Sequence, residues 1–421
     1  MYLEPNCPEI IRKAVADAEE TLLHQLPRID EIAAHNHAKV LKAFQAERVS
    51  TYHLQGTTGY GLDDSGREVL DRVVARILGT EAALVRGQFV SGTHAIACAL
   101  FGVLRPGDHV ISVSGAPYDT LEEVIGLRGE GQGSLIDFGV SYDAIALDSQ
   151  GKIQYELLGK SITDKTRMLM VQRSRGYAWR DSLMIAQIKE LVNFVKKRFP
   201  QIIIFVDNCY GELVEKQEPG EMGVDLMAGS LIKNLGGSLA PTGGYVAGRS
   251  DLVDLTAQRL TAPGIGGHMG ATLEWQRLFY QGLFLSPLTV SEAIKGAVFS
   301  AAFWRALGFE VHPEPEAPRT DLIQAVKLGS RTKMISFCEG IQKGSPVDSH
   351  VSPIPCAMPG YEDEVIMAGG TFIQGATSEF SADGPLREPY IVYQQGGISS
   401  TYVQMGNILA ALNLWEQGLL D

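Results

Sequence analysis

The chain has 421 residues, and its 36 basic and 49 acidic side chains give a formal net charge of −13. This acidic balance argues against nucleic acid and against an anionic membrane surface as partners, because no basic excess is available to neutralise phosphates. Hydrophobic residues make up 45% of the chain, which excludes global disorder and allows two or three domains of about 100–200 residues each.

The five cysteines are widely spread and lack the CxxC spacing of metal or redox motifs. Their odd number and spacing argue against a disulfide scaffold and a zinc site, and favour reduced thiols. The N-terminal segment has no basic start followed by an apolar run, so we expect no signal peptide. Two uncharged stretches of membrane length, residues 87–104 and 389–415, are interrupted by Gly, Gln, Ser and Thr, which is typical of buried segments. We therefore expect a cytoplasmic protein that holds no metal.

Apolar residues recur at helical spacing over residues 8–48, which predicts one or two amphipathic helices interrupted at Pro27. After a glycine-rich loop, the sequence Ser65-Gly-Arg-Glu68 predicts the capping box of the next helix. Short apolar runs then alternate with helical segments: we predict strands at 82–86, 109–114, 167–172 and 202–207, and helices at 92–104 and 182–198. This alternation predicts an α/β fold with a mostly parallel sheet.

The pattern changes after about residue 285. From there we predict a long helix at 291–307, a turn at 312–318, and strands near 370–373 and 390–394. This mixture is typical of a smaller α+β domain. We therefore divide the chain into an N-terminal helical arm (1–55), a large α/β domain (56–285) and a small C-terminal α+β domain (286–421).

Two of the candidate functional motifs follow apolar strands. Ser91-Gly92-Thr93 opens an apolar helix, where unpaired N–H groups, the helix dipole and two hydroxyls could bind an anion. An ordinary N-cap is the more frequent use of such residues. Asp207 ends a fully apolar strand. Because ligands of α/β sheets bind beyond the carboxyl ends of strands, Asp207 points to the expected crevice, with a cap as the alternative.

The third motif is Lys233, in the sequence GSLIKNLGG. Small and apolar neighbours would desolvate this amine and lower its pKa, which makes Lys233 a candidate Schiff-base nucleophile. A solvated turn residue is the alternative for an isolated lysine beside glycines. The three motifs are more informative together, because an anion site, a carboxylate at a strand end and a lysine in a glycine-rich loop follow one another along one α/β domain.

This order resembles the fold-type I enzymes that depend on pyridoxal 5′-phosphate (PLP), which need a phosphate cradle, a carboxylate for the ring nitrogen and a lysine for covalent attachment. More closely, the chain is similar to the bacterial aluminium-resistance family, also described as methionine gamma-lyase-like, within the Cys/Met metabolism group. The similarity covers nearly the whole chain and is carried by the motifs TTGYGLDDSGRE, SGTHA, QRSRGY, VDNCYGE, GSLIKNLGGSLAPTGGY and GGTFIQGA…SADGPLREPY.

The resemblance implies the fold-type I PLP-dependent transferase fold, with a mostly parallel seven-stranded sheet in the large domain. It implies that Lys233 binds the cofactor covalently and that Asp207 pairs with the ring nitrogen. The other cofactor-binding residues that it implies are Ser91, Gly92, Thr93 and Ser230 at the phosphate, and Tyr118 stacked on the ring. We expect the cationic site to lower the pKa of Tyr118, so that Tyr118 acts as acid or base beside the leaving sulfur.

The resemblance also implies a homodimer or homotetramer, in which Tyr60 contacts the phosphate of a neighbouring subunit. Two features depart from the Cys/Met enzymes: Ile232 stands where they have a threonine, and the arginine that follows their tyrosine by two residues is absent. For the substrate carboxylate, Arg387 is the candidate because a guanidinium forks onto two oxygens. Arg173 and Arg175 are candidates for contacts with cofactor or substrate anions, with ordinary salt bridges as the alternative.

The resulting hypothesis is a PLP-dependent carbon–sulfur lyase that acts on an amino acid such as methionine, cystathionine or cysteine by β- or γ-elimination. Three alternatives stay open. The chain could catalyse another PLP reaction, such as transamination or aldol cleavage. It could bind PLP without catalysis, or it could be a Schiff-base aldolase that uses Lys233 without PLP.

Overall fold

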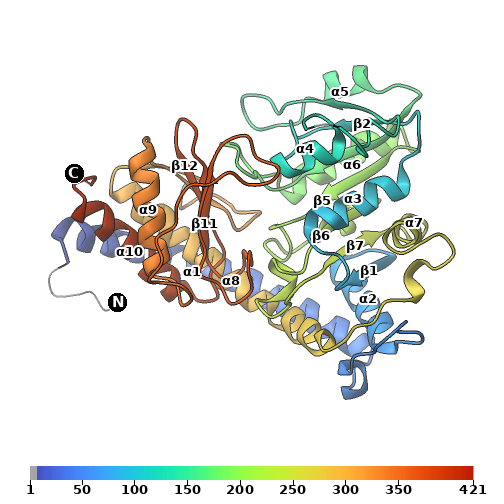
Figure 1. Cartoon of the computed structure of the whole chain (residues 1–421), viewed down its shortest axis with the longest axis horizontal. Coiled ribbons are helices and arrows are strands. Elements are labelled where there is room, and N and C mark those ends of the chain that lie inside the picture. The colour runs from blue at the N-terminus through green and yellow to red at the C-terminus, as the bar shows by residue number, and fades with distance from the viewer. Residues whose placement is uncertain (1–6, 130, 421) are drawn as a thin grey trace. The chain divides into compact units, whose positions relative to one another are not determined.

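The computed structural model describes residues 7–129 and 131–420. Among these residues, no helix combines the length and the apolar character that crossing a membrane requires. The chain divides into two compact units (Figure 1). One comprises the described residues up to Ala34, Tyr177–Asp181 and those from Pro287 onward; the other comprises His35–Gly176 and Ser182–Ser286. The domain boundaries at 55 and 285 stay predictions, and residues 1–6 and 421, on which the domain and signal-peptide predictions partly fall, lie outside the described residues.

The larger unit contains a seven-stranded sheet in the order β1-β7-β6-β5-β4-β2-β3. Its strands are β1 (Ala82–Arg86), β2 (His109–Ser112), β3 (Ser141–Ala144), β4 (Thr166–Gln172), β5 (Ile203–Asp207), β6 (Leu226–Ser230) and β7 (Gly244–Gly248). The pairs among β2 to β6 are parallel, whereas β7 runs antiparallel to both β1 and β6. The predicted mostly parallel seven-stranded sheet is confirmed.

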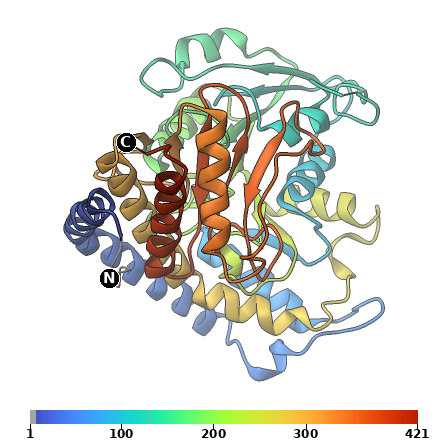
Figure 2. The same cartoon turned by 60° about the vertical axis from the view of Figure 1, so that its left-hand side comes forward.

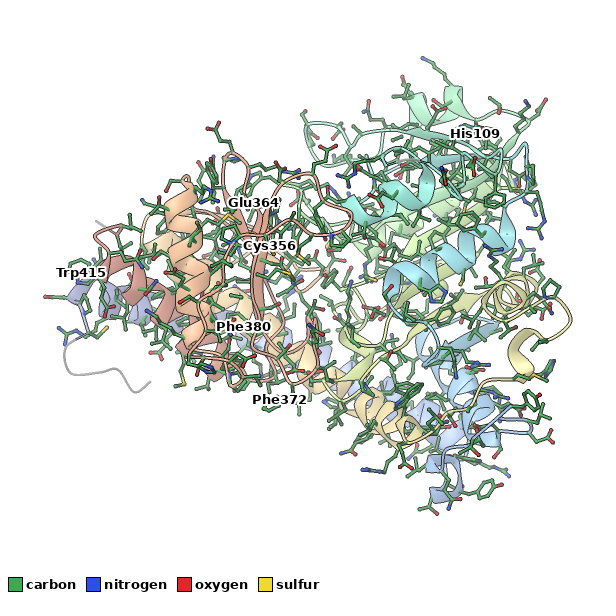
Figure 3. The ribbon with its side chains drawn as sticks, in the orientation of Figure 1. His109, Cys356, Glu364, Phe372, Phe380 and Trp415 are labelled. Carbon is green, nitrogen blue, oxygen red and sulfur yellow. The ribbon has the colours of Figure 1, made fainter. Side chains whose placement is uncertain are left out.

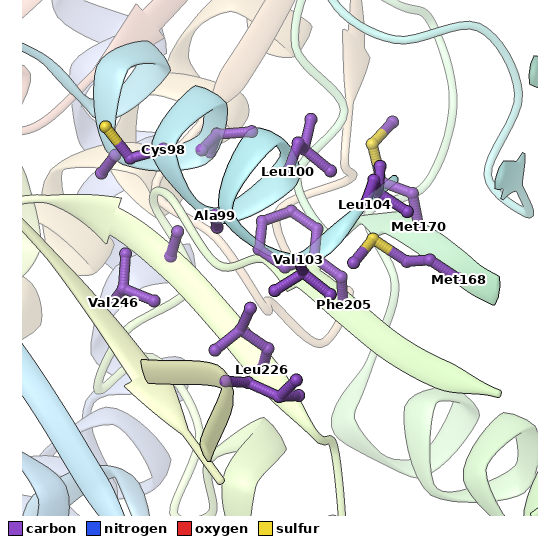
Figure 4. Close-up of a cluster of buried hydrophobic side chains, with 14 of the residues drawn as sticks. Cys98, Ala99, Leu100, Val103, Leu104, Met168, Met170, Phe205, Leu226 and Val246 are labelled. Atoms are coloured by element: carbon purple, nitrogen blue, oxygen red, sulfur yellow. The ribbon is translucent and has the colours of Figure 1, made fainter. Parts of the chain in front are cut away.

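Helices of the same unit cover this sheet: α2 (Ser65–Leu78), α3 (Gly92–Val103), α4 (Asp119–Ile125), α5 (Tyr155–Ser161), α6 (Ile185–Arg198) and α7 (Ser250–Leu260). Figure 4 shows the core beneath α3, where Val103 of the helix faces Phe205 and Leu226 of the strands. Burying such side chains contributes about 1.5–3 kcal/mol each. The apolar face of α3 therefore anchors its N-terminus over the central strands.

The smaller unit contains an antiparallel five-stranded sheet in the order β10-β11-β12-β9-β8. Its strands are β8 (Glu310–His312), β9 (Gln324–Lys327), β10 (Val365–Ala368), β11 (Ser381–Pro385) and β12 (Ile391–Gln395). Helices α9 (Arg331–Lys343) and α10 (Ser400–Glu416) lie side by side, in orange and dark red in Figure 2. A separate, smaller α+β part is thus present, as predicted.

Three local predictions are wrong. Residues 9–46 form one helix, α1 (Glu9–Ala46), that continues through Pro27, since a proline removes one hydrogen bond and the rest of a long helix can tolerate that loss. The N-cap of α2 is Asp64, which accepts a hydrogen bond from the Arg67 amide, and Ser65 is its first helical residue.

No strand forms at 370–373 within the described residues. The backbone N–H groups of Phe372 and Ile373 donate to the Glu379 carboxylate, so a side chain replaces the partner strand. The Phe372 side chain, labelled in Figure 3, is 73% exposed. A second long helix, α8 (Trp275–Ala306), includes the predicted helix near 291 and begins well before it.

Candidate active site

Asp207 lies at the carboxyl end of β5, in register with Gln172 of β4 and Ala228 of β6. It is 6% exposed, and its Oδ1 accepts a hydrogen bond of 3.1 Å from the Cys209 amide. Burial raises the pKa of Asp207, while the positive charge of Lys233 opposes that rise. The carboxyl group therefore lies at the sheet edge where α/β proteins bind ligands, next to a cation that favours its ionised form.

Lys233 follows β6 and precedes a short 3₁₀ helix, η3 (Asn234–Gly236). Its side chain is half-buried, and its Nζ lies 3.9 Å from the centroid of the Tyr210 ring. Burial alone lowers the pKa of Lys233, but the charges of Cys209, Tyr210 and Asp207 raise it, and the net direction is well upward. The predicted lowering of this pKa is wrong, because the prediction counted burial and missed the acidic groups that the fold brings to the amine.

Glycines allow the Lys233 loop to fold tightly. A Cβ at Gly236 would lie 1.6 Å from the Leu231 carbonyl oxygen, and one at Gly237 would lie 2.1 Å from the Gly282 carbonyl oxygen of α8. Gly237 also has φ 53°, in the left-handed region that favours glycine. The loop therefore packs backbone against backbone, which fixes the direction in which Lys233 leaves the sheet edge.

The predicted anion site lies at the N-terminus of α3. Ser91 is the N-cap, and its Oγ accepts a hydrogen bond of 3.1 Å from the His94 amide. A Cβ at Gly92 would lie 3.2 Å from the Ser230 Cβ and 3.3 Å from the Cys209 Sγ. The Ser230 Oγ is buried and has no hydrogen-bond partner among residues 7–129 and 131–420. A buried hydroxyl without a partner, beside a helix N-terminus, is suited to an anion.

Tyr118 joins this group of residues from the start of α4. Its hydroxyl lies 3.0 Å from the Thr93 Oγ1 in a hydrogen bond, and its amide donates to the Gln172 Oε1 at 2.9 Å. Burial raises the pKa of Tyr118, and the nearby Asp207 charge raises it further. The expected lowering of this pKa is therefore wrong, and the phenol holds its proton more tightly than a free tyrosine does.

Arg173 and Arg175 are both buried in the larger unit. The Arg173 NH1 donates to the Asn208 Oδ1 at 2.7 Å and to the Gly211 carbonyl oxygen at 3.0 Å, and its NH2 lies 3.1 Å from Glu215. These bonds hold the segment that follows β5. The Arg175 amide donates to Ser182. A direct role of either arginine at a ligand stays a prediction.

Two predicted site residues are exposed. Tyr60 is 74% exposed, and its carbonyl accepts a hydrogen bond from the Gly270 amide. Arg387 belongs to the smaller unit, between β11 and β12, and its NH1 lies 3.2 Å from Asp363. Tyr60 lies in the larger unit with Lys233, and its predicted contact is with a neighbouring subunit, whereas Arg387 lies in the other unit. The roles of Tyr60 and Arg387 stay predictions.

Sequence reasoning missed three polar residues at this site: Tyr210, Glu212 and Tyr245. Tyr210 contacts Lys233. Glu212 is fully buried, and its Oε1 accepts a hydrogen bond of 2.8 Å from the Tyr245 hydroxyl. Burial raises the pKa of Glu212 to about 8. For Tyr210 and Glu212 the available signal was the polar run that follows Asp207 in VDNCYGE, because residues just beyond a strand end lie at the ligand-binding edge.

Comparison with known proteins gives the family. A family model described as methionine gamma-lyase matches residues 11–415. The chain belongs to the methionine gamma-lyase family. It is 49% identical to the protein YnbB of Bacillus subtilis over 98% of both chains. The structure of a carbon-sulfur lyase involved in aluminium resistance from Clostridium novyi is 47% identical, with a TM-score of 0.92 over 97% of this chain and 96% of that one.

The fold agrees with a more distant structure. The PLP-dependent protein YhfS of Escherichia coli is 16% identical, with a TM-score of 0.61 over 91% of this chain and 97% of that one. At that identity the likeness shows the fold alone. The predicted fold-type I class and the resemblance to the methionine gamma-lyase-like, aluminium-resistance family are both confirmed.

Proposed function

We propose that this protein is a PLP-dependent carbon–sulfur lyase, which eliminates a thiol from an amino acid such as methionine, cystathionine or cysteine. The observation that carries the proposal is the meeting of Asp207, Lys233 and the N-terminus of α3 at one edge of the sheet. Membership of the methionine gamma-lyase family and likeness to a carbon-sulfur lyase support the reaction class.

The residues present fit the cofactor. The partnerless Ser230 hydroxyl, the hydroxyl of Thr93 and the N–H groups that begin α3 would bind its phosphate, with Gly92 leaving the room that a Cβ would take. Asp207 would hold a proton on the ring nitrogen, since a buried carboxylate favours a cationic partner. When bound, the cofactor withdraws electrons from the Cα of the amino acid and so allows its proton to leave.

Lys233 and Tyr118 would handle the protons. Lys233 would hold the cofactor covalently until the substrate amine displaces it, and its Nζ would then take the Cα proton. Tyr118 keeps its proton because burial raises its pKa, so it would act as an acid toward the departing sulfur rather than as a base. For β-elimination, the proton balance closes when the thiol leaves with the Tyr118 proton and Lys233 returns its proton to that phenol.

Arg387 and Tyr60 complete the proposal. Arg387 would bind the substrate carboxylate, so Arg387→Ala should raise KM for amino acids and leave amines without a carboxylate unaffected. Tyr60 would contact the phosphate in a neighbouring subunit of a homodimer or homotetramer. Its exposure supports this role, and so do the hydrogen bonds of its loop, in which the Arg67 guanidinium donates to the carbonyl oxygens of Gly61 and Gly270.

Borohydride reduction followed by peptide mapping tests the core of the proposal. The pyridoxyl group should appear on Lys233, Lys233→Ala should abolish turnover, and the wild-type enzyme should release keto acid and thiol in equal amounts. A label on another lysine would contradict the assignment. Keto acid without thiol would indicate transamination, and a bound cofactor without turnover of any amino acid would indicate a non-catalytic PLP-binding protein.

A further inference from the structure

The Tyr210 ring lies against the amine of Lys233. The Nζ is 3.9 Å from the ring centroid, over its face, and both side chains are half-buried. An ammonium group within about 6 Å of an aromatic face is attracted by the negative π-surface, and partial burial strengthens the attraction. The neutral amine carries no full charge, so the contact favours the protonated form of Lys233.

The Tyr210 backbone is held by the same loop that carries the lysine. Asn234, which directly follows Lys233, donates from its Nδ2 to the carbonyl oxygens of Tyr210 at 3.0 Å and of Glu212 at 2.8 Å. Tyr210 has φ 69°, in the left-handed region that is costly for an aromatic residue. Surrounding contacts must maintain such a conformation, and the Asn234 amide supplies two of them.

We propose that Tyr210 is a positioning residue that holds the ammonium form of Lys233 at the carboxyl edge of the sheet, with Asn234 fixing the backbone from which the ring extends. The use of this contact in catalysis rests on the proposed function, in which the Nζ of Lys233 takes the Cα proton and so becomes an ammonium group. By stabilising the cation, the ring makes Lys233 a stronger base for that step. The contact itself is a property of the chain and can be tested without the reaction.

Other groups also face Lys233 and must be kept constant in a test. They are Asp207 at the end of β5, Tyr118 at the start of α4, and Cys209 and Glu212 in the segment after β5. The acidic members of this group favour the ammonium form by their charge. A test therefore has to change the electron density on the face of the Tyr210 ring, while the size of the ring and these neighbours stay unaltered.

A series of rings of nearly equal size meets this requirement. Full-length protein would carry Tyr210→Phe, or 3,5-difluorophenylalanine or pentafluorophenylalanine at position 210, since ring fluorines progressively remove the negative π-face. Each protein, with the cofactor removed, would be acetylated at about pH 9, where a lysine is mostly protonated, and the rate of modification at Lys233 would be followed by peptide mass spectrometry. Far-UV circular dichroism and thermal unfolding would establish that each variant folds.

The Tyr210→Phe protein, which keeps the ring face and lacks the hydroxyl, is the reference for the fluorinated rings. The rate at Lys233 should rise through the fluorinated series, by about tenfold at pentafluorophenylalanine, as the fraction of free amine increases. Lys333, whose Nζ lies 5.5 Å from the Phe309 ring, is the internal control and should not change. Equal rates at Lys233 across the series would overturn the proposal.

The outcome separates this proposal from the proposed function. If the series behaves as expected but borohydride places the cofactor on another lysine, the contact stands and the lyase assignment fails. If Lys233 carries the cofactor and the series is flat, Tyr210 has no effect on the charge of the amine and only this proposal fails.

Discussion

Glu212 offers a sharp test of how burial sets protonation at this site. Its side chain is fully buried, its Oε1 accepts the Tyr245 hydroxyl at 2.8 Å, and its Oε2 has no partner in the part of the chain that the structure describes. Burial raises its pKa from 4.5 to about 8, and the Glu218 charge adds to the rise. Near neutral pH the folded protein therefore holds Glu212 as a neutral acid.

The effect on stability follows from linkage. Between the pKa of an unfolded glutamate, about 4.3, and the folded value of about 8, the folded state binds more protons than the unfolded state, so stability falls as pH rises. The stabilising contribution is fully present below the unfolded pKa and is lost as pH rises through the folded pKa. At about 1.4 kcal/mol per pKa unit, the loss between about pH 6 and about pH 9 is about 3 kcal/mol.

Glu212→Gln should remove this dependence, because its amide oxygen can still accept the Tyr245 hydroxyl while the side chain cannot ionise. We would measure denaturant unfolding of both proteins in the same cofactor state across that pH range. The wild-type protein should lose about 3 kcal/mol more than the variant. The exposed Glu274 provides the control, since Glu274→Gln should keep the wild-type dependence.

An infrared measurement tests the same carboxyl directly. The C=O band of a protonated, buried carboxylic acid should be present near neutral pH in the wild-type protein and absent from Glu212→Gln. If the unfolding curves of the two proteins run parallel and this band is missing, Glu212 is ionised in the fold. The reasoning from burial would then be refuted.

Other predictions concern the loop, the ring partner and the assembly. Gly237→Ala should destabilise the fold by about 3 kcal/mol more than Gly418→Ala. Both glycines have positive φ, but only at Gly237 would the added Cβ clash with a backbone oxygen. Equal losses of stability in thermal unfolding would contradict this. Asp207→Asn should slow turnover on the order of 10²-fold with modest loss of cofactor, and an unchanged rate would make Asp207 a mere cap. Mixed dimers of Tyr60→Phe and Lys233→Ala subunits should recover up to about half of the wild-type activity if Tyr60 acts in trans, and none if it acts within its own subunit.

The parts of the site that lie at strand ends could be predicted from the sequence. Asp207 ends the apolar strand β5, and Ser230 ends β6 just before Lys233. The parallel sheet therefore determines where both residues lie. Because parallel strands end at the same edge, the order of these residues along the chain was enough to bring them together. The N-terminus of α3 follows by the same logic, since a helix after a strand begins at that edge.

The protonation states could not be predicted in this way. For Lys233 the sequence shows apolar neighbours, whereas its pKa is raised by groups from β5, from the following segment and from α4. Glu212 is an ordinary glutamate in the sequence, and only the fold removes it from water. The left-handed backbone of Tyr210 is likewise invisible in the sequence, because its stabilising partner, Asn234, is 24 residues away.

The charge balance around Lys233 depends on these hidden states. Burial raises the pKa of Asp207 and the positive charge of Lys233 opposes that rise, while Glu212 stays neutral near pH 7 because burial raises its pKa to about 8. Asp207 and Lys233 are therefore coupled at the sheet edge, and Glu212 adds no charge to them near pH 7. An ionised Glu212 would add a negative charge that opposes any anion approaching the N-terminus of α3 and Ser230. A neutral Glu212 thus lets the same small region keep a protonated lysine and still accept a phosphate, which is the combination that the proposed cofactor requires.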